Sequence, residues 1–317
     1  MKKNTKKIVT AAGIAAGTAA VASLSAYVTI KALIDTALDR EMPKVMEKAD
    51  KRISGEKSSD EFTNRMESAS ESLAVQPNET VEIIAHDGEK LVGHYFPCEK
   101  PERVIIAFHG WRSSWHRDFG MISDFWYKNN CSVLYVEQRG QNNSSGEYMG
   151  FGLTERFDCL DWLNWEIERC GSDIPVYLAG VSMGATTVLM AAGLQLPPNV
   201  HGIMADCGFT SANAIWEHIA KDNLHIRFGI RSAIADRMCR RKIQVGSKEH
   251  STVEALKHTH VPVILVHGAD DHFVPVEMTY ENYTACTAPK DLLIVPGADH
   301  GMSYFMEPEK YENAVKA

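Results

Sequence analysis

The stretch Val176-Tyr177-Leu178-Ala179-Gly180-Val181-Ser182-Met183-Gly184 decides the fold of this chain. Its first residues are apolar, as expected of a buried strand, and the residues that follow it, Met183 to Leu194, have the pattern of an amphipathic helix. Ser182 therefore lies where a strand turns sharply into a helix. Gly180 and Gly184 leave room for that turn and for close contact between helix and strand. A G-x-S-x-G spacing in this setting predicts that Ser182 is a nucleophile.

Outward from Ser182, short apolar runs alternate with helical stretches from about residue 79 to residue 317. The Asp87-Gly88 turn joins the first two runs into a hairpin. This alternation predicts an α/β domain with a mostly parallel, doubly wound sheet of about eight strands and helices on both faces. The expected strands are Val81–Ala85, Leu91–Phe96, Arg103–Phe108, Cys131–Val136, Val176–Ala179, Gly202–Ala205, Val261–Val266 and Leu292–Val295.

One segment breaks the alternation. Phe209 to Gly246 follows a strand and looks helical, and no new strand begins before Val261. In a doubly wound sheet, an insertion after the carboxyl end of a strand lies over the binding crevice. The sequence therefore predicts a small helical lid over approximately residues 209–250.

A serine nucleophile needs a base, a group that orients the base, and donors for the oxyanion. Two acids, Asp270 and Asp271, follow the strand that ends at Val266, and His300 follows the strand that ends at Val295. Both loops lie at the carboxyl edge of the sheet, as Ser182 does. Loops that converge from one edge give the geometry that a catalytic triad needs.

Four motifs carry a resemblance to a known family. They are His109-Gly110-Trp111; Arg139-Gly140 with Ser145-Gly146; Gly180–Gly184; and His267-Gly268-Ala269-Asp270-Asp271-His272-Phe273-Val274-Pro275, followed by Gly297-Ala298-Asp299-His300. From about Val81 to its end, the chain resembles the α/β-hydrolase superfamily, especially bacterial membrane-anchored members of the lysophospholipase and serine-aminopeptidase-like branch. The family order of nucleophile, acid and histidine implies Ser182, Asp271 and His300. The family pattern Gly-x-x-Asp-x-x-Val-Pro selects Asp271 over Asp270.

The resemblance also implies two backbone donors and a reaction. The oxyanion donors would be the N–H groups of Trp111 and Met183. The aromatic residues Trp115, Trp216 and Phe228 suggest a pocket for an apolar group of the substrate. The implied function is that of a serine esterase, either a carboxylesterase or a lysophospholipase. A peptidase or amidase of the aminopeptidase type, a thioesterase and a non-catalytic binding module are the alternatives.

Composition narrows the classes of partner. The 317 residues carry a net charge of −8, which argues against nucleic acid, because phosphate binding needs a basic face. Seven scattered cysteines without a C-x-x-C pair form neither a disulfide framework nor a zinc pattern. No metal and no cofactor are expected, and the expected partner is a small or lipid-derived acyl substrate. The oligomeric state is left open.

The N-terminus carries a membrane signal. Lys2, Lys3, Lys6 and Lys7 precede an uncharged stretch from Ile8 to Ile30, long enough to cross a bilayer. The sequence predicts a membrane anchor over residues 1–31, with the catalytic domain outside the cytoplasm. A cleaved signal peptide, with a site near Ala20-Val21-Ala22, is the alternative. Residues 32–78 are expected to form a polar helical spacer between the membrane and the domain at 79–317.

Overall fold

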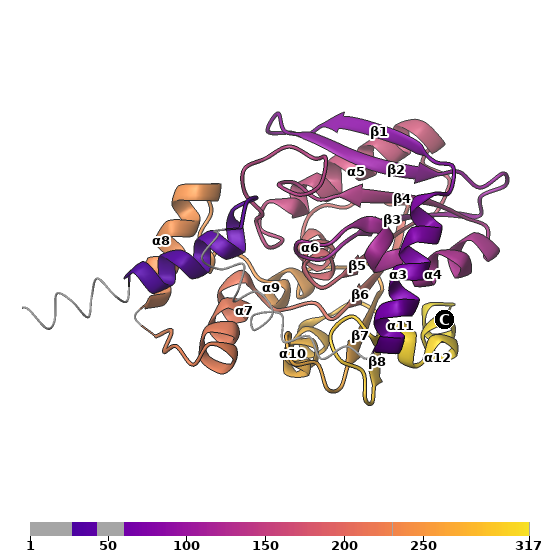
Figure 1. Ribbon diagram of the computed structural model, residues 1–317. Helices are drawn as coiled ribbons and strands as arrows, with labels where there is room; N and C mark the ends of the chain where they lie inside the picture. Colours follow the sequence, from indigo (N-terminus) through magenta and orange to yellow (C-terminus); the bar gives the residue numbers. More distant parts are fainter. Residues whose placement is uncertain (1–26, 43–59, 230, 317) are drawn as a thin grey trace, which may run out of the picture.

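The computed structural model describes residues 27–42, 60–229 and 231–316, and an eight-stranded sheet forms its centre (Figure 1). The strand order is β1-β2-β4-β3-β5-β6-β7-β8. β2 runs antiparallel to both of its neighbours, and every other pair is parallel. The strands are β1 (Glu79–Ile84), β2 (Lys90–Phe96), β3 (Arg103–Phe108), β4 (Cys131–Glu137), β5 (Val176–Val181), β6 (Val200–Asp206), β7 (Val263–Gly268) and β8 (Lys290–Val295).

The predicted sheet is confirmed, because each expected apolar run forms a strand. The central strands are covered on both faces, and all seven residues of β4 are buried. Strands of this kind have continuous apolar sequences instead of alternating ones. That is why they stand out in the sequence.

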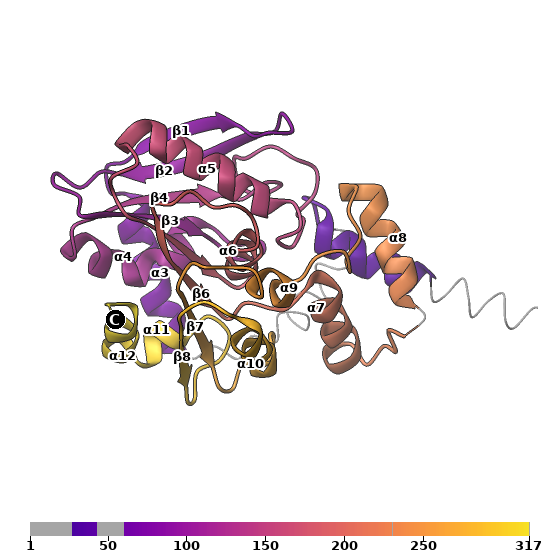
Figure 2. The same ribbon diagram turned by 180° about the vertical axis from the view of Figure 1, so that it is seen from behind.

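Helices cover both faces of the sheet, as Figures 1 and 2 show from opposite sides. One face packs against α5, α6, α9 and α10, and the other against α3, α4, α11 and α12. These helices are α3 (Asp60–Ala74), α4 (Trp115–Lys128), α5 (Glu155–Cys170), α6 (Met183–Ala191), α9 (Thr252–Leu256), α10 (Val276–Ala285), α11 (Ser303–Met306) and α12 (Pro308–Lys316). The short α11, directly after His300, is not expected from the sequence.

The segment predicted as a lid contains α7 (Ala212–His218), the π-helix η1 (Ile219–Asn223) and α8 (Arg231–Ile243). A second segment packs with it. We call residues 27–42 the N-terminal strap; its residues 27–38 are helical and lie beside α8 (Figures 1 and 2). Strap and lid share one apolar cluster, to which the strap contributes Ile30, Leu33, Ile34, Ala37 and Leu38. The lid is therefore built from two parts of the chain.

The structure describes only part of the predicted membrane anchor and spacer. The expected span, residues 8–30, falls for the most part outside the described residues, and none of the described helices is both long and apolar enough to cross a membrane. The polar helical spacer expected over residues 32–78 stays a prediction, and its described portions make contacts with the domain. The strap packs against the lid, and α3 buries Phe62, Met66 and Leu73 against the domain. Apolar residues at helical spacing account for both contacts.

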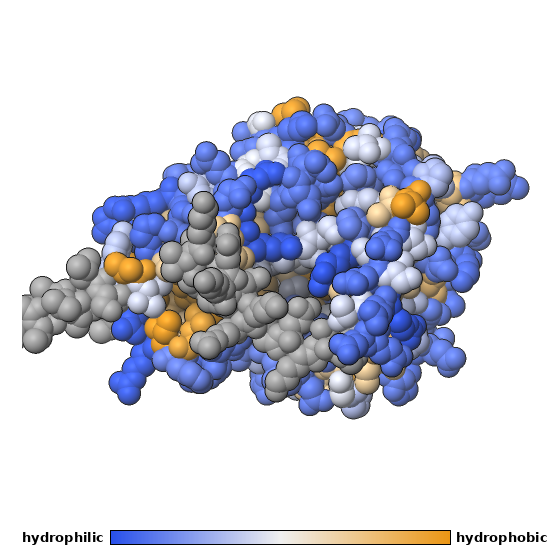
Figure 3. All heavy atoms as spheres, viewed as in Figure 1, coloured by the Kyte–Doolittle hydropathy of each residue, from blue (hydrophilic) through white to orange (hydrophobic). Residues whose placement is uncertain are grey.

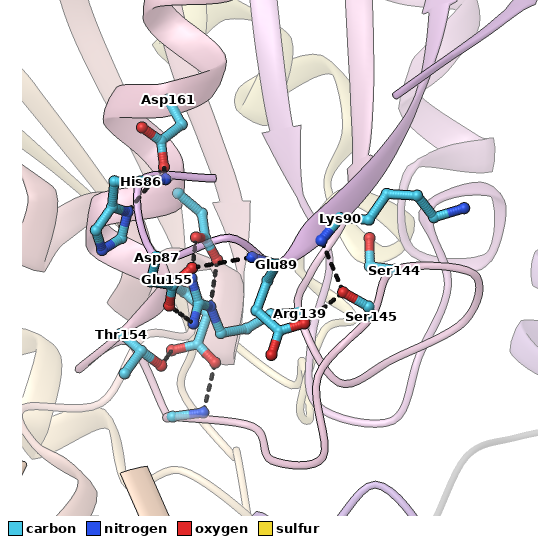
Figure 4. Close-up of polar contacts among 12 residues, drawn as sticks. His86, Asp87, Glu89, Lys90, Arg139, Ser144, Ser145, Thr154, Glu155 and Asp161 are labelled. Atoms are coloured by element: carbon cyan, nitrogen blue, oxygen red, sulfur yellow. Dashed lines mark hydrogen bonds and ion pairs between the residues drawn. The ribbon is translucent and has the colours of Figure 1, made fainter. Parts of the chain in front are cut away.

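A charged network holds the loop between β4 and α5 (Figure 4). The buried Arg139 guanidinium donates to both oxygens of Asp158 and, at 2.7 Å, to Asp87. The buried carboxylate of Glu155 accepts the backbone N–H groups of Gly150 and Gly152. These bonds fix the shape of a loop that carries the Arg139-Gly140 and Ser145-Gly146 motifs.

Most of the face shown in Figure 3 that is not covered by grey atoms is hydrophilic. Hydrophobic side chains gather at its left, where Figure 1 places the strap and the lid. Among the described residues there, Tyr27 and Val28 at the start of the strap are exposed.

Candidate active site

Ser182 occupies a strained turn between β5 and α6. Its backbone has φ 55° and ψ −116°, in the left-handed region of φ that residues other than glycine rarely adopt. The flanking glycines are required for this turn. A Cβ atom on Gly180 would lie 2.3 Å from the carbonyl oxygen of Gly184, and one on Gly184 would lie 1.8 Å from that of Phe108. The strain holds the serine hydroxyl at the carboxyl edge of the sheet.

Two hydrogen bonds in series connect Ser182 to His300 and His300 to Asp271. The Oγ of Ser182 is 3.0 Å from Nε2 of His300, and Nδ1 of His300 is 2.7 Å from Oδ2 of Asp271. The three residues follow β5, β8 and β7, which end at the same edge of the sheet. The structure thus brings together the three residues that the sequence nominates.

Asp271 is held as an anion. Its Oδ1 accepts the backbone N–H groups of Phe273 and Val274, each at 2.8 Å, and its Oδ2 lies 3.1 Å from Nε2 of His267. Burial alone would raise its pKa, but His300 and His267 hold the pKa of Asp271 well below its usual range. Two backbone donors therefore fix one oxygen while the histidines share the other.

The neighbouring acids have other partners. Asp270 turns away, and its Oδ2 accepts the N–H of Gly297 at 2.9 Å. The Oδ1 of Asp299 accepts the N–H groups of His272 and His300, at 3.0 and 2.8 Å. Of the three acids, only Asp271 hydrogen-bonds the imidazole of His300 among the described contacts. Asp299 instead braces the loop that carries this histidine.

His300 combines burial with a charged neighbour. Burial disfavours the imidazolium form, but the carboxylate of Asp271 raises the pKa of His300 well above 6.5. Its ring also packs edge-on against Phe273, with centroids 5.0 Å apart. An imidazole in this position is within reach of the Ser182 hydroxyl proton, and the carboxylate of Asp271 lies where it would stabilise the imidazolium form.

The two expected oxyanion donors lie beside Ser182. Met183 is the first residue of α6, so its N–H has no partner within the helix, and Trp111 lies in the loop after β3. The amides on either side of Trp111 have acceptors: Gly110 donates to Asp118 and Arg112 donates to Gln141, both at 2.6 Å. In the described parts of the chain, no protein acceptor is found for the N–H of Trp111 or of Met183.

Two cavities meet at Ser182. The larger, about 400 Å³, is lined by His300, Asp299 and the loop after β3, and it extends between α3, α4 and α11. The smaller, about 20 Å³, is almost wholly apolar and lies beneath the lid and the strap. Trp111 and Phe273 line both cavities. Ser182 thus faces two spaces of different size and polarity.

The three aromatic residues expected at the substrate have different surroundings. Trp216 lines the small cavity. Phe228 is buried in the apolar cluster of lid and strap but is not among the residues described as lining either cavity. Trp115 is the first residue of α4 and stacks on His94, with centroids 4.5 Å apart, on the flank of the sheet. Trp115 is not among the described residues that line either cavity, because its ring packs into the core formed with α4; its expected contact with the substrate stays a prediction.

Three features near the site were not read from the sequence. The strap contributes to the small cavity. Arg112, in a left-handed backbone conformation with φ 52°, donates to carbonyl oxygens of the strap. The Cys207 thiol is buried, and its Sγ lies within 4.8 Å of ligand atoms of Asp271 and His300. A signal existed only for the strap, in the helical spacing of its apolar residues.

Two groups of side chains in the described part of the chain lie close enough to share a metal ion. The first is Cys207 with Asp271 and His300, two of which already hydrogen-bond each other. The second is His86 with Asp158 and Asp161, where Arg139 occupies both oxygens of Asp158. Neither donor set is free to act as a ligand without breaking these bonds.

Comparisons with known proteins agree with this geometry. The model of the alpha/beta hydrolase family matches residues 104–314, more than half of the chain. The uncharacterised protein YqkD of Bacillus subtilis is 24% identical over 228 residues, which cover 70% of this chain and 72% of YqkD. YfhR of Escherichia coli K12, also uncharacterised, is 23% identical over 231 residues, which cover 70% of this chain and 73% of YfhR.

Solved structures show the same fold. An esterase from Pyrococcus furiosus superposes with a TM-score of 0.61 at 20% identity, covering 77% of this chain and 90% of the esterase. Est1E of Butyrivibrio proteoclasticus, solved with ferulic acid bound, gives a TM-score of 0.59 at 19% identity, covering 74% of this chain and 96% of Est1E. Sheet order, the strained serine turn and the family match lead to one conclusion: the chain belongs to the α/β-hydrolase family.

Proposed function

We propose that this protein is a serine hydrolase that cleaves carboxylic esters, with Ser182 as nucleophile, His300 as general base and acid, and Asp271 as the group that orients His300. The observation that carries the proposal is the unbroken hydrogen-bond sequence from Ser182 to Asp271. The strained backbone of Ser182 supports it, because such strain collects at functional positions.

The reaction has two halves. In the first, Nε2 of His300 takes the proton of the Ser182 hydroxyl as its oxygen attacks the carbonyl carbon, and the N–H groups of Trp111 and Met183 stabilise the oxyanion. His300 then gives that proton to the leaving alcohol, and an acyl group remains on Ser182. In the second half, His300 takes a proton from water as the water oxygen attacks the acyl carbon. The bond between that carbon and the Oγ of Ser182 then breaks, His300 returns the proton to Oγ, and the free acid leaves.

An aminopeptidase would need a free carboxylate near the nucleophile to bind an α-amino group. The larger cavity contains Asp118 and Asp299. Both oxygens of Asp118 are occupied, by the N–H of Gly110 and the hydroxyl of Ser113. The Oδ1 of Asp299 accepts two backbone N–H groups, and its Oδ2 lies 3.3 Å from Nδ1 of His272. These contacts favour an ester over a peptide as the substrate.

A fluorophosphonate probe tests the nucleophile. We expect stoichiometric labelling of Ser182 in the folded wild type and none in Ser182→Ala. The variant should also lose roughly 10⁶-fold in kcat for a nitrophenyl ester. Absence of labelling in folded wild type would overturn the proposal. A comparison of kcat/KM for nitrophenyl esters, thioesters and aminoacyl anilides then tests the choice of ester.

We further propose that the uncharged stretch that begins at Ile8 and leads into the strap attaches the enzyme to a membrane. Residues 27–30 of the expected span belong to the strap, where Ile30 packs against the lid. Four lysines followed by 23 uncharged residues support this anchor. If the anchor is correct, the full chain sediments with membranes and stays there after an alkaline wash. Release of a shorter protein, with a new N-terminus near Ala22, would instead support the cleaved signal peptide. Either outcome leaves the N-terminal strap in the protein.

A further inference from the structure

The small cavity at Ser182 carries an inference about the substrate. Its volume of about 20 Å³ is enough for one water molecule or one methyl group. Its walls come from the strap, through Leu33, Thr36 and Ala37, and from the lid, through Ile215, Trp216 and Ile219. Almost no polar surface faces the cavity, so it suits a hydrocarbon group.

The position of His300 decides which part of an ester enters which cavity. A general acid must reach the atom that it protonates, so the leaving alcohol departs on the side of His300. His300 lines the larger cavity and is not among the described residues that line the smaller one. The acyl group extends from the carbonyl carbon in the other direction. It therefore points into the small apolar cavity.

The strap is fixed firmly enough to act as a wall. The indole Nε1 of Trp111 donates to the carbonyl of Ala37 at 3.0 Å. The Arg112 guanidinium donates to the carbonyls of Thr36 and Arg40, at 3.0 and 2.9 Å. These carbonyls lie at and just past the C-terminal end of the helix, where they lack helical partners and where a cation is favoured.

Ion pairs attach the strap to the lid as well. Lys242 of α8 contacts the carboxylates of Asp35, at 3.2 Å, and of Asp39. These contacts leave less than a fifth of the Lys242 side chain exposed. The strap therefore bridges the lid and the loop that carries the Trp111 amide.

We propose that the N-terminal strap is the outer wall of an acyl subsite that admits an acetyl group and excludes longer chains. The substrates are then acetate esters of larger alcohols, with the alcohol in the cavity on the side of His300. This inference rests on the proposed esterase function and narrows it. It favours a small-molecule carboxylesterase over a lysophospholipase, because a fatty acyl chain exceeds the small cavity.

The test compares kcat/KM of the full-length protein for nitrophenyl esters of increasing acyl length. We expect kcat/KM for nitrophenyl acetate to exceed that for the butyrate by about tenfold or more, and that for the octanoate by still more. In Leu33→Ala, which opens the strap side of the cavity, the ratio of butyrate to acetate should rise about tenfold. Ile215→Ala opens the lid side and should shift the ratio in the same direction, in case Leu33→Ala does not fold.

Leu38→Ala is the matched control. Leu38 is fully buried in the same cluster of strap and lid but is not among the residues that line the cavity. This variant should lose similar stability and keep the wild-type ratio. An equal shift in Leu38→Ala would attribute the effect to loosened packing and overturn the proposal.

The two proposals fail in different ways. A wild type that hydrolyses octanoate as fast as acetate, while the probe labels Ser182, overturns the acyl subsite and leaves the esterase intact. A folded wild type that neither reacts with the probe nor hydrolyses any ester overturns the esterase itself.

Discussion

Two clusters of buried charge each pair an acid with a basic side chain. They differ in whether that basic side chain can gain and lose a proton near neutral pH. In one, Asp271 after β7 is paired with His300 and His267, and in the other, Asp158 at the start of α5 is paired with Arg139. The pKa of Arg139 is raised by Asp158 in spite of burial, so the guanidinium keeps its charge at all working pH values. An imidazole can gain and lose a proton near neutral pH.

From this difference we expect the Asp271 cluster to take part in the reaction and the Asp158 cluster to stabilise the fold. Because an imidazole can change its charge, the proposed function has the first cluster move a proton to and from Ser182. Because Arg139 keeps its charge, we expect the second cluster to hold the shape of the loop around Glu155 (Figure 4). Substitution of the acid should therefore affect activity in the first cluster and stability in the second.

The largest expected effect is that of Asp271→Asn on activity. An amide in this position favours the wrong tautomer of His300 and cannot stabilise its imidazolium, so kcat should fall about 10⁴-fold. Steady-state hydrolysis of nitrophenyl acetate measures it. Asp270→Asn is the matched control and should stay within about tenfold of wild type, because Asp270 contacts Gly297 and not His300. A loss of equal size in both variants would contradict the assignment.

Asp158→Asn should lower the stability of the fold and leave the activity nearly unchanged. It leaves Arg139 buried with a single weaker partner, Asp87, and breaking such a buried pair costs about 3–5 kcal/mol in the free energy of unfolding. Urea unfolding measures this cost, while kcat/KM under folding conditions should change less than about tenfold. Asp124→Asn breaks an exposed pair with Lys128 and should cost at most about 1 kcal/mol. Equal costs in the two variants would show that the Arg139 network does not brace the fold.

The pH profile gives a smaller effect. Hydrolysis needs neutral His300, and Asp271 raises the pKa of His300, so kcat/KM should fall as pH drops through a value above 6.5. Asp158→Asn should leave this dependence on pH in place, since Asp158 is not among the groups that shift the pKa of His300. In Asp271→Asn the fall in kcat/KM should occur at a lower pH, because burial then lowers the pKa of His300 and no carboxylate raises it. An acid limb below 6.5 in wild type would contradict this account.

The smallest effect is expected at Cys207. Burial raises the pKa of its thiol to about 11, so almost no thiolate is present at neutral pH. Iodoacetamide at neutral pH should therefore leave activity unchanged, and Cys207→Ala should react with the fluorophosphonate probe as wild type does. Inactivation of wild type by iodoacetamide, with resistance in Cys207→Ala, would show instead that this thiol is reactive.

The sheet and the order of the three nominated residues can be predicted because their signals are local. A buried parallel strand needs a continuous apolar run, and the turn at Ser182 needs glycines at fixed positions. Asp271 and His300 each follow a strand directly, so parallel topology alone brings them to one edge. The roles of these residues remain predictions for the experiments above.

The surroundings of the site could not be predicted in the same way. Trp115 looks like a pocket residue by its position near Trp111, but only the packing of α4 shows that its ring faces His94. Most of the strap lies within residues 32–78, a segment whose many charged residues predict a polar spacer. Its buried apolar residues fall at positions 30, 33, 34, 37 and 38, the spacing of one helix face, and this spacing is the signal that predicts a packed helix.

The strap also has a consequence for synthesis of the chain. It is translated early, whereas α8, which supplies Lys242, follows almost two hundred residues later. Because a domain generally folds as a unit, the apolar face of the strap has no partner until the lid has been made. A chaperone that binds short apolar helices would therefore find the strap accessible on ribosome-bound chains. The strap would become inaccessible to the chaperone once residue 243 has emerged and the lid has packed against it.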